Sequence, residues 1–131
     1  MSQVKKVLLV DDDADFVQIN KSALSKAGYN VVAAYDGKEC LRKVHTEKPD
    51  VIVLDLMMAT WSEGFDVAET LRGAVETRDI PIILVTAVNM DNPLEAEPGL
   101  RSLFPANEYM AKPVEPEELV GAVKRALSHK A

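Results

Sequence analysis

Short runs of consecutive apolar residues constrain the fold more than any other feature of this sequence. Residues 51–54 read Val-Ile-Val-Leu, and similar runs occupy residues 7–10 and 80–85. Such uninterrupted runs are typical of strands that are buried on both faces, as they are in a parallel sheet. Parallel strands need long crossover connections, which are usually helices. The runs therefore predict a chain in which buried strands alternate with helices.

The segments between the runs carry the expected helical patterns. Asp13 is expected to cap the start of a first helix, and Gly28 is placed to end it in a left-handed conformation. Asp36 with Glu39 has the spacing of a capping box that opens a second helix. A third helix is expected over residues 65–75, after an irregular loop at residues 59–64. The apolar face predicted for the first helix comprises Phe16, Ile19, Ala23, Leu24 and Ala27.

Together with weaker strands at residues 29–34 and 108–111, these patterns give five strand–helix units in residues 1–131. Right-handed crossovers would place helices on both faces of one sheet. The predicted fold class is therefore a single, three-layer, doubly wound α/β domain. The fourth helix should be irregular or shortened, because prolines recur between residues 88 and 105.

Composition excludes several classes of protein. The apolar runs are far shorter than the ~20 residues that a membrane span needs, and the net charge of −6 argues against direct nucleic-acid binding. Cys40 is the single cysteine, so an intramolecular disulfide is ruled out and the cytoplasm is the expected location. Cys40 itself is expected to be a small buried apolar residue.

Polar residues follow the ends of the predicted strands. Asp11 and Asp12 follow the first strand, Asp55 the third, Thr86 the fourth and Lys112 the fifth. The carboxyl ends of parallel strands meet at one edge, where open α/β sheets bind their ligands. Clustered carboxylates repel one another and favour a hard cation such as Mg²⁺. A hydroxyl and an ammonium beside them suit a phosphoryl group, so the pattern predicts an aspartyl phosphorylation site.

The order Asp-Asp, Asp, Thr-Ala and Lys-Pro, each after its own strand, resembles the receiver domain of two-component response regulators. The resemblance covers essentially the whole chain and implies a flavodoxin-like sheet with strand order 2-1-3-4-5. It implies that Asp55 is the phosphoacceptor. Asp11, Asp12, Asp55 and the main-chain carbonyl of Met57 would bind Mg²⁺, or Mn²⁺ in its place.

The same resemblance assigns roles to residues on the last two strands. Thr86 and Lys112 would contact phosphoryl oxygens, and Tyr109 would turn inward when Thr86 moves toward the phosphate. The peptide bond before Pro113 would be cis. The resemblance therefore implies that the protein is a signalling phosphoprotein. It would accept its phosphoryl group from a sensor histidine kinase or a histidine phosphotransfer protein.

No output domain follows the last helix in this chain, so the expected output is a conformational switch that controls a separate, unidentified protein, unless residues 1–131 are a fragment of a longer protein. A homodimer is also compatible. We do not expect an enzyme with external substrates, but only self-phosphorylation and slow self-dephosphorylation. The dephosphorylation should be slow because neither Met57 nor Val88, two positions after Asp55 and Thr86, can orient a water molecule by hydrogen bonding.

Other interpretations stay open at this point. The chain could be a receiver-like binding module that signals without phosphate. A Mg²⁺-dependent phosphohydrolase is less consistent with the sequence, since such enzymes generally carry a second Asp where Met57 stands. A dinucleotide or flavin domain would need a Gly-rich loop after the first strand, and this sequence has none there. The single tryptophan, Trp61, is either an anchor of the loop at residues 59–64 or a contact for a partner.

Overall fold

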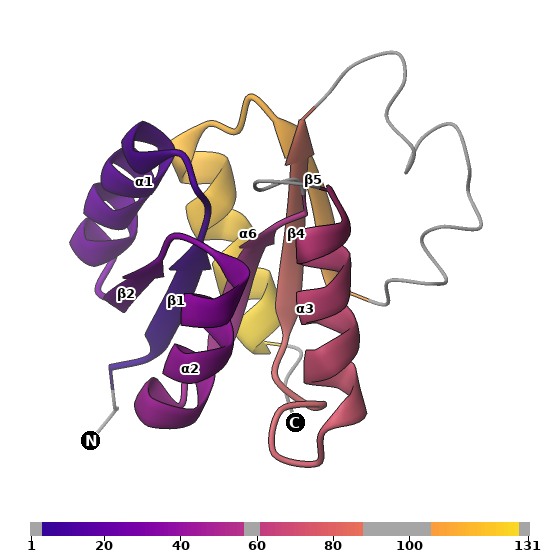
Figure 1. Ribbon diagram of the computed structural model, residues 1–131. Coiled ribbons are helices and arrows are strands. Elements are labelled where there is room, and N and C mark those ends of the chain that lie inside the picture. Colours follow the sequence, from indigo (N-terminus) through magenta and orange to yellow (C-terminus); the bar gives the residue numbers. More distant parts are fainter. Residues whose placement is uncertain (1–3, 57–60, 88–105, 129–131) are drawn as a thin grey trace.

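Figure 1 shows the computed structural model, a five-stranded parallel sheet between two layers of helices. The structure describes residues 4–56, 61–87 and 106–128. The strands are β1 (Lys6–Val10), β2 (Asn30–Ala34), β3 (Val51–Asp55), β4 (Ile82–Ala87) and β5 (Glu108–Lys112). The helices described are α1 (Ala14–Lys26), α2 (Gly37–Glu47), α3 (Trp61–Gly73) and α6 (Pro116–Ser128).

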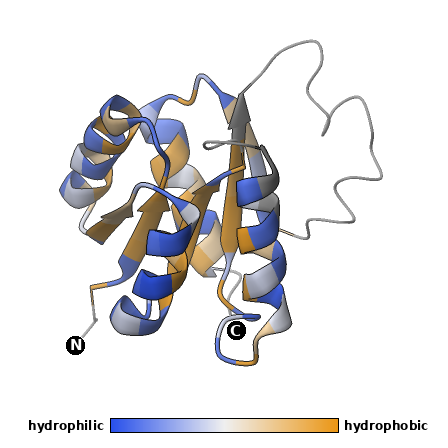
Figure 2. Ribbon diagram, in the orientation of Figure 1, coloured by the Kyte–Doolittle hydropathy of each residue, from blue (hydrophilic) through white to orange (hydrophobic). Residues whose placement is uncertain are grey.

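The strand order is β2-β1-β3-β4-β5, which confirms the doubly wound, flavodoxin-like arrangement. Helices α1 and α6 contact each other on one face of the sheet, and α2 and α3 contact each other on the opposite face (Figure 1). Each face has its own apolar core, because successive strand residues point to opposite sides. All five residues of β3 are buried, as expected for the central strand. Figure 2 shows that the strands are mostly hydrophobic, whereas the helices carry both hydrophobic and hydrophilic residues.

Both ends of α1 are formed as predicted. The side chain of Asp13 accepts hydrogen bonds from the backbone N–H groups of Asp15 and Phe16, at 3.0 and 3.3 Å. Gly28 follows the helix with a φ of +101°, a conformation that glycine adopts without strain. These two signals place α1 directly after the acidic residues at the end of β1.

The predicted inward face of α1 was partly wrong. The buried residues are Val17, Asn20 and Leu24, whereas Ile19 is 56% exposed and Ala27 lies on the surface. The pattern of apolar residues did not indicate this inward face, because one of its members, Asn20, is polar. Its side-chain amide donates a 2.8 Å hydrogen bond to the carbonyl of Phe16, one turn earlier in the helix.

The start of α2 is a modified capping box. Asp36 accepts from the backbone N–H of Glu39 at 2.8 Å, as the spacing predicted. The Glu39 carboxylate, however, reaches back to the N–H of Tyr35 at 2.7 Å, and this bond lowers its pKa. Helix α2 is thereby fixed to the end of β2 by two carboxylates.

Cys40 of α2 is fully buried, and its burial raises the pKa of the thiol from 9.0 to about 12. The unfolded chain releases this proton near pH 9, whereas the folded chain keeps it, so stability should fall as the pH rises between these two values. We expect wild type to lose roughly 1 kcal/mol more than Cys40→Ala between pH 8 and pH 10. Urea denaturation of both proteins at the two pH values measures this difference; an identical loss would contradict it.

Helix α3 differs from its predicted limits. It begins at Trp61 rather than at residue 65 and ends at Gly73, so residues 61–64 are helical and Trp61 is not a loop residue. Gly64, the last residue of the predicted loop, lies within the helix, where a Cβ atom would clash with the backbone of Leu56. The remainder of the predicted loop and the predicted fourth-helix segment, residues 88–105, lie outside the described residues.

No helix in the described ranges is long and apolar enough to cross a membrane.

Candidate functional site

Three carboxylates meet at the carboxyl edge of the two central strands. Asp55 is the last residue of β3, and Asp11 directly follows β1, which is hydrogen-bonded to β3. Asp11 and Asp55 are 0% and 3% exposed, while Asp12 lies at the surface. Their carboxylate oxygens include a set that lies within 4.8 Å of one another. The structure thus confirms that these three predicted residues form one acidic cluster.

Backbone contacts fix the position of Asp11. Its N–H donates to the carbonyl of Ala34 at 3.1 Å, which extends the pairing of β1 with β2 by one residue. Its Oδ1 atom accepts a 2.9 Å hydrogen bond from the N–H of Asp13, at the start of α1. The side chain is therefore held in the angle between the strand end and the helix that follows.

Lys112, the last residue of β5, places its ammonium beside the cluster. Its Nζ atom lies 2.8 Å from Oδ2 of Asp11 and 3.8 Å from Oδ2 of Asp55. It also lies 4.4 Å from the centroid of the Phe16 ring, on α1. Burial favours a lower pKa for Lys112, but the hydrogen bond to Asp11 and the charge of Asp55 outweigh burial and raise it. The Lys112–Pro113 peptide bond is cis.

The donor set fits a divalent cation. Three carboxylates and one ammonium carry two formal negative charges, which a dication balances. Carboxylate oxygens are the ligands that Mg²⁺ prefers, and an exposed residue such as Asp12 leaves room for the waters that this ion retains. Asp11, Asp12 and Asp55 are therefore the described residues that could hold the metal. Met57, the fourth predicted ligand, lies outside the described residues.

The two predicted switch residues lie on β4 and on the edge strand β5, in the same half of the sheet. Thr86 is in β4, in register with Ala111, one position before the Ala87–Lys112 pair. Tyr109 is half-buried against the core between the sheet and α2–α3, and its hydroxyl accepts a 3.2 Å hydrogen bond from the N–H of Ala106. Thr86 is thus on the strand between those of Asp55 and Lys112, and Tyr109 is on the same strand as Lys112.

Comparison with known proteins identifies the family. The profile described as "Response regulator receiver domain" matches residues 7–124. This chain belongs to the response regulator receiver domain family. The alkaline phosphatase synthesis transcriptional regulatory protein PhoP of Bacillus subtilis is 39% identical over 125 residues, which cover 94% of this chain and 48% of that protein. The receiver domain thus spans about half the length of the curated relatives that it matches.

Solved receiver structures agree in fold. The chemotaxis response regulator CheY4 of Vibrio cholerae is similar with a TM-score of 0.82 and 30% identity, covering 95% of this chain and all of that one. A CheY-like response regulator receiver domain protein from Methanospirillum hungatei has a TM-score of 0.82 and 26% identity, covering 98% and 97% of the two chains. The chain is therefore similar to receivers along nearly its whole length.

Two contacts of this receiver domain were not predicted. Phe16 packs against the core as predicted, and its ring also lies under the Lys112 ammonium. No local sequence pattern indicates this contact, because it joins α1 to the end of β5. Asn107, just before β5, exchanges two hydrogen bonds with the backbone of Ile82: its side chain accepts at 2.9 Å and its N–H donates at 2.8 Å.

Proposed function

We propose that this receiver domain is the phosphoacceptor of a two-component phosphorelay, and that Asp55 carries the phosphoryl group. The observation that supports this most is the buried position of Asp55 at the edge of the sheet, where its carboxylate lies beside those of Asp11 and Asp12 and 3.8 Å from the Lys112 ammonium. A carboxylate acts as a nucleophile in its ionised form, and when it is buried neighbouring cations stabilise that form. The same cations attract an anionic phosphoryl donor.

The donor is a phosphohistidine of a sensor histidine kinase or of a histidine phosphotransfer protein. A carboxylate oxygen of Asp55 attacks phosphorus, an O–P bond forms, and the N–P bond to the imidazole breaks. The electron pair of that bond stays with the imidazole, which takes a proton from solvent. Lys112 Nζ lies 3.8 Å from Asp55 Oδ2. At this distance the ammonium can pair with an oxygen of a phosphoryl group whose phosphorus is bonded to Asp55.

Asp11 and Asp12, with Asp55 and the Met57 carbonyl, would hold Mg²⁺, for which Mn²⁺ can substitute. When bound, the ion neutralises charge on the phosphoryl oxygens. The chain itself contributes the orientation of the ligands, since Asp11 is fixed by its bonds to Asp13 and Ala34.

The output is a shift between two conformations through Thr86 and Tyr109, read by a separate protein. We take residues 1–131 as one receiver unit that works in the cytoplasm, with no catalysis on external substrates. Tyr109 supports the switch because its hydroxyl contacts Ala106 while its ring packs on the core, so a change of rotamer would alter the start of β5.

Metal removal tests this proposal. Incubation with a small phosphodonor such as acetyl phosphate should add one phosphate in the presence of Mg²⁺, and EDTA should abolish the addition. Intact mass spectrometry measures both. Phosphorylation that proceeds equally in EDTA would overturn the role of the acidic cluster as a metal site.

The phosphorylated form should be long-lived, because Met57 and Val88 offer no side-chain group that orients water. Val88→Glu should shorten the half-life of the aspartyl phosphate by about tenfold, less than the ~10²–10⁴-fold that an optimally positioned general base contributes. Val88→Leu is the matched apolar control and should leave the half-life unchanged. The decay of the phosphorylated mass after removal of the donor measures it, and equal decay of all three proteins would contradict the expectation.

A further inference from the structure

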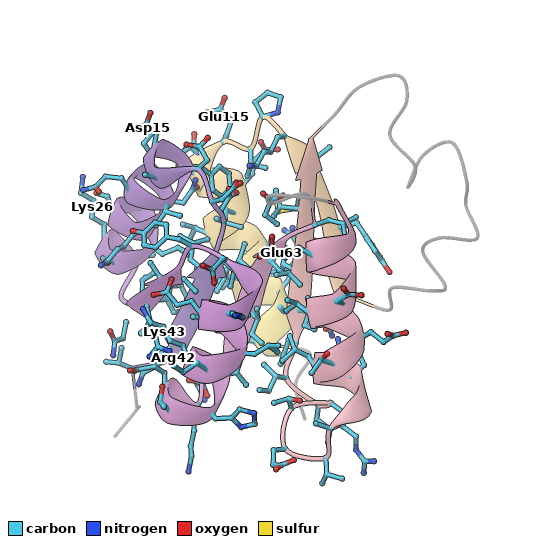
Figure 3. The ribbon with its side chains drawn as sticks, in the orientation of Figure 1. Asp15, Lys26, Arg42, Lys43, Glu63 and Glu115 are labelled. Atoms are coloured by element: carbon cyan, nitrogen blue, oxygen red, sulfur yellow. The ribbon has the colours of Figure 1, made fainter. Side chains whose placement is uncertain are left out.

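Glu63 makes a contact between two helices that the proposed function does not use. Its Oε2 atom accepts a 2.6 Å hydrogen bond from the N–H of Gly37, the first residue of α2. Figure 3 labels Glu63 at the first turn of α3, on the side of that helix that faces α2. A carboxylate at a helix N-terminus is favoured by the helix dipole, and its hydrogen bonds are stronger than those between neutral groups.

The next residue, Gly64, fixes the same turn of α3 from the other side. It is buried, and a Cβ atom placed on it would lie 2.6 Å from the Cα atom of Leu56 and closer still to the Leu56 carbonyl oxygen. Leu56 directly follows Asp55, and its N–H is held by the carbonyl of Val85 at 2.8 Å. The first turn of α3 is therefore in contact with the backbone next to Asp55.

Helix α2 is connected in turn to the other buried carboxylate. Asp11 donates its N–H to Ala34, the last residue of β2, and only two residues separate Ala34 from Gly37. The Glu63–Gly37 hydrogen bond thus joins the segment beside Asp11 to the segment that follows Asp55. Helices α2 and α3 also pack against each other, and this hydrogen bond adds a directional contact at the end nearest the acidic cluster.

We propose that Glu63 is a positioning residue for the acidic site. It holds the first turn of α3 against α2, and so fixes the turn whose Gly64 contacts the backbone of Leu56, the residue after Asp55. The inference rests on the proposed function, since Asp11 and Asp55 are there metal ligands. Loss of the bond should weaken metal binding without removing any carboxylate of the cluster.

Four variants test this, with Mg²⁺ affinity measured by calorimetry and Asp55 phosphorylation measured by intact mass. Glu63→Ala removes the acceptor, whereas Glu63→Gln keeps a carbonyl oxygen for the Gly37 N–H. Glu69→Ala removes the same charge from an exposed position of α3. Thr77→Val removes a buried 2.6 Å hydrogen bond to Leu71 and so destabilises the other end of this helix.

Glu63→Ala should weaken Mg²⁺ binding by roughly threefold to tenfold, the lower end of the effects of residues that orient metal ligands. Glu63→Gln should restore most of the affinity, and the other two variants should keep it. Amide exchange at Gly37 should accelerate in Glu63→Ala alone. Wild-type affinity in Glu63→Ala, or an equal loss in Thr77→Val, would overturn the inference while leaving the proposed function intact. A wild type that neither binds Mg²⁺ nor accepts phosphate would overturn both.

Discussion

Gly64→Ala should lower the free energy of unfolding by about 2 kcal/mol, although the substitution lies within a helix. Alanine has the higher helix propensity, by about 1 kcal/mol. That gain is outweighed because the added methyl group would meet the backbone of Leu56, which is held in the sheet and cannot move as a side chain can. Inserting atoms into a close-packed contact typically costs about 1–3 kcal/mol, and contacts with backbone lie at the upper end. Urea denaturation measures the change.

Gly73→Ala is the matched control in the same helix. A Cβ at Gly73 would meet nothing within 4 Å, so alanine there should raise the free energy of unfolding by roughly 0.5–1 kcal/mol. Opposite signs at the two glycines would show that the close approach to Leu56, and not helix propensity, decides the outcome at Gly64. Stabilisation by both substitutions would contradict the packing described for α3.

Lys112→Met should destabilise the metal-free protein by about 2 kcal/mol. It keeps an apolar stem beside Phe16 but removes the ammonium that lies 2.8 Å from the buried Asp11 carboxylate. Removing one partner of a fully buried pair costs about 3–5 kcal/mol, and the partial exposure of Lys112 reduces that penalty. Thermal or urea denaturation in EDTA measures the loss.

A double-mutant cycle with Asp11→Asn isolates this ion pair. Lys112→Met should cost much less in the Asp11→Asn background, because the uncompensated charge is then absent. Mg²⁺ should also recover part of the stability lost by the single variant, since a bound dication replaces the missing positive charge. Equal costs of Lys112→Met in both backgrounds would contradict the ion pair as the source of the effect.

The buried strands and the acidic cluster could be predicted from sequence because their signals are local. The run at residues 51–54 specifies a strand that is buried on both faces, and Asp11 and Asp55 follow from the rule that ligand sites lie at the carboxyl ends of parallel strands. Capping residues such as Asp13 and Gly28 fixed the ends of α1 for the same reason.

The errors occurred where tertiary contacts override local preference. Ile19 appeared apolar and therefore buried, but Asn20 occupies the inward position because its amide bonds within the helix. The loop predicted at residues 59–64 was wrong at Gly64, which is helical. This glycine allows a close contact between two backbone segments, which no local pattern encodes. Glu63 contacts Gly37, 26 residues away in the sequence, and Phe16 lies beside Lys112 of another element. These contacts could therefore be identified only from the structure.

Locating the phosphate tests the central claim most directly. Wild type and Asp55→Asn should be incubated with acetyl phosphate and Mg²⁺, and the modified residue mapped by peptide mass spectrometry after intact mass measurement. We predict one phosphate on the wild type, at Asp55, and none on Asp55→Asn. No modification of the wild type, or equal modification of Asp55→Asn, would contradict the assignment of Asp55 as the phosphoacceptor.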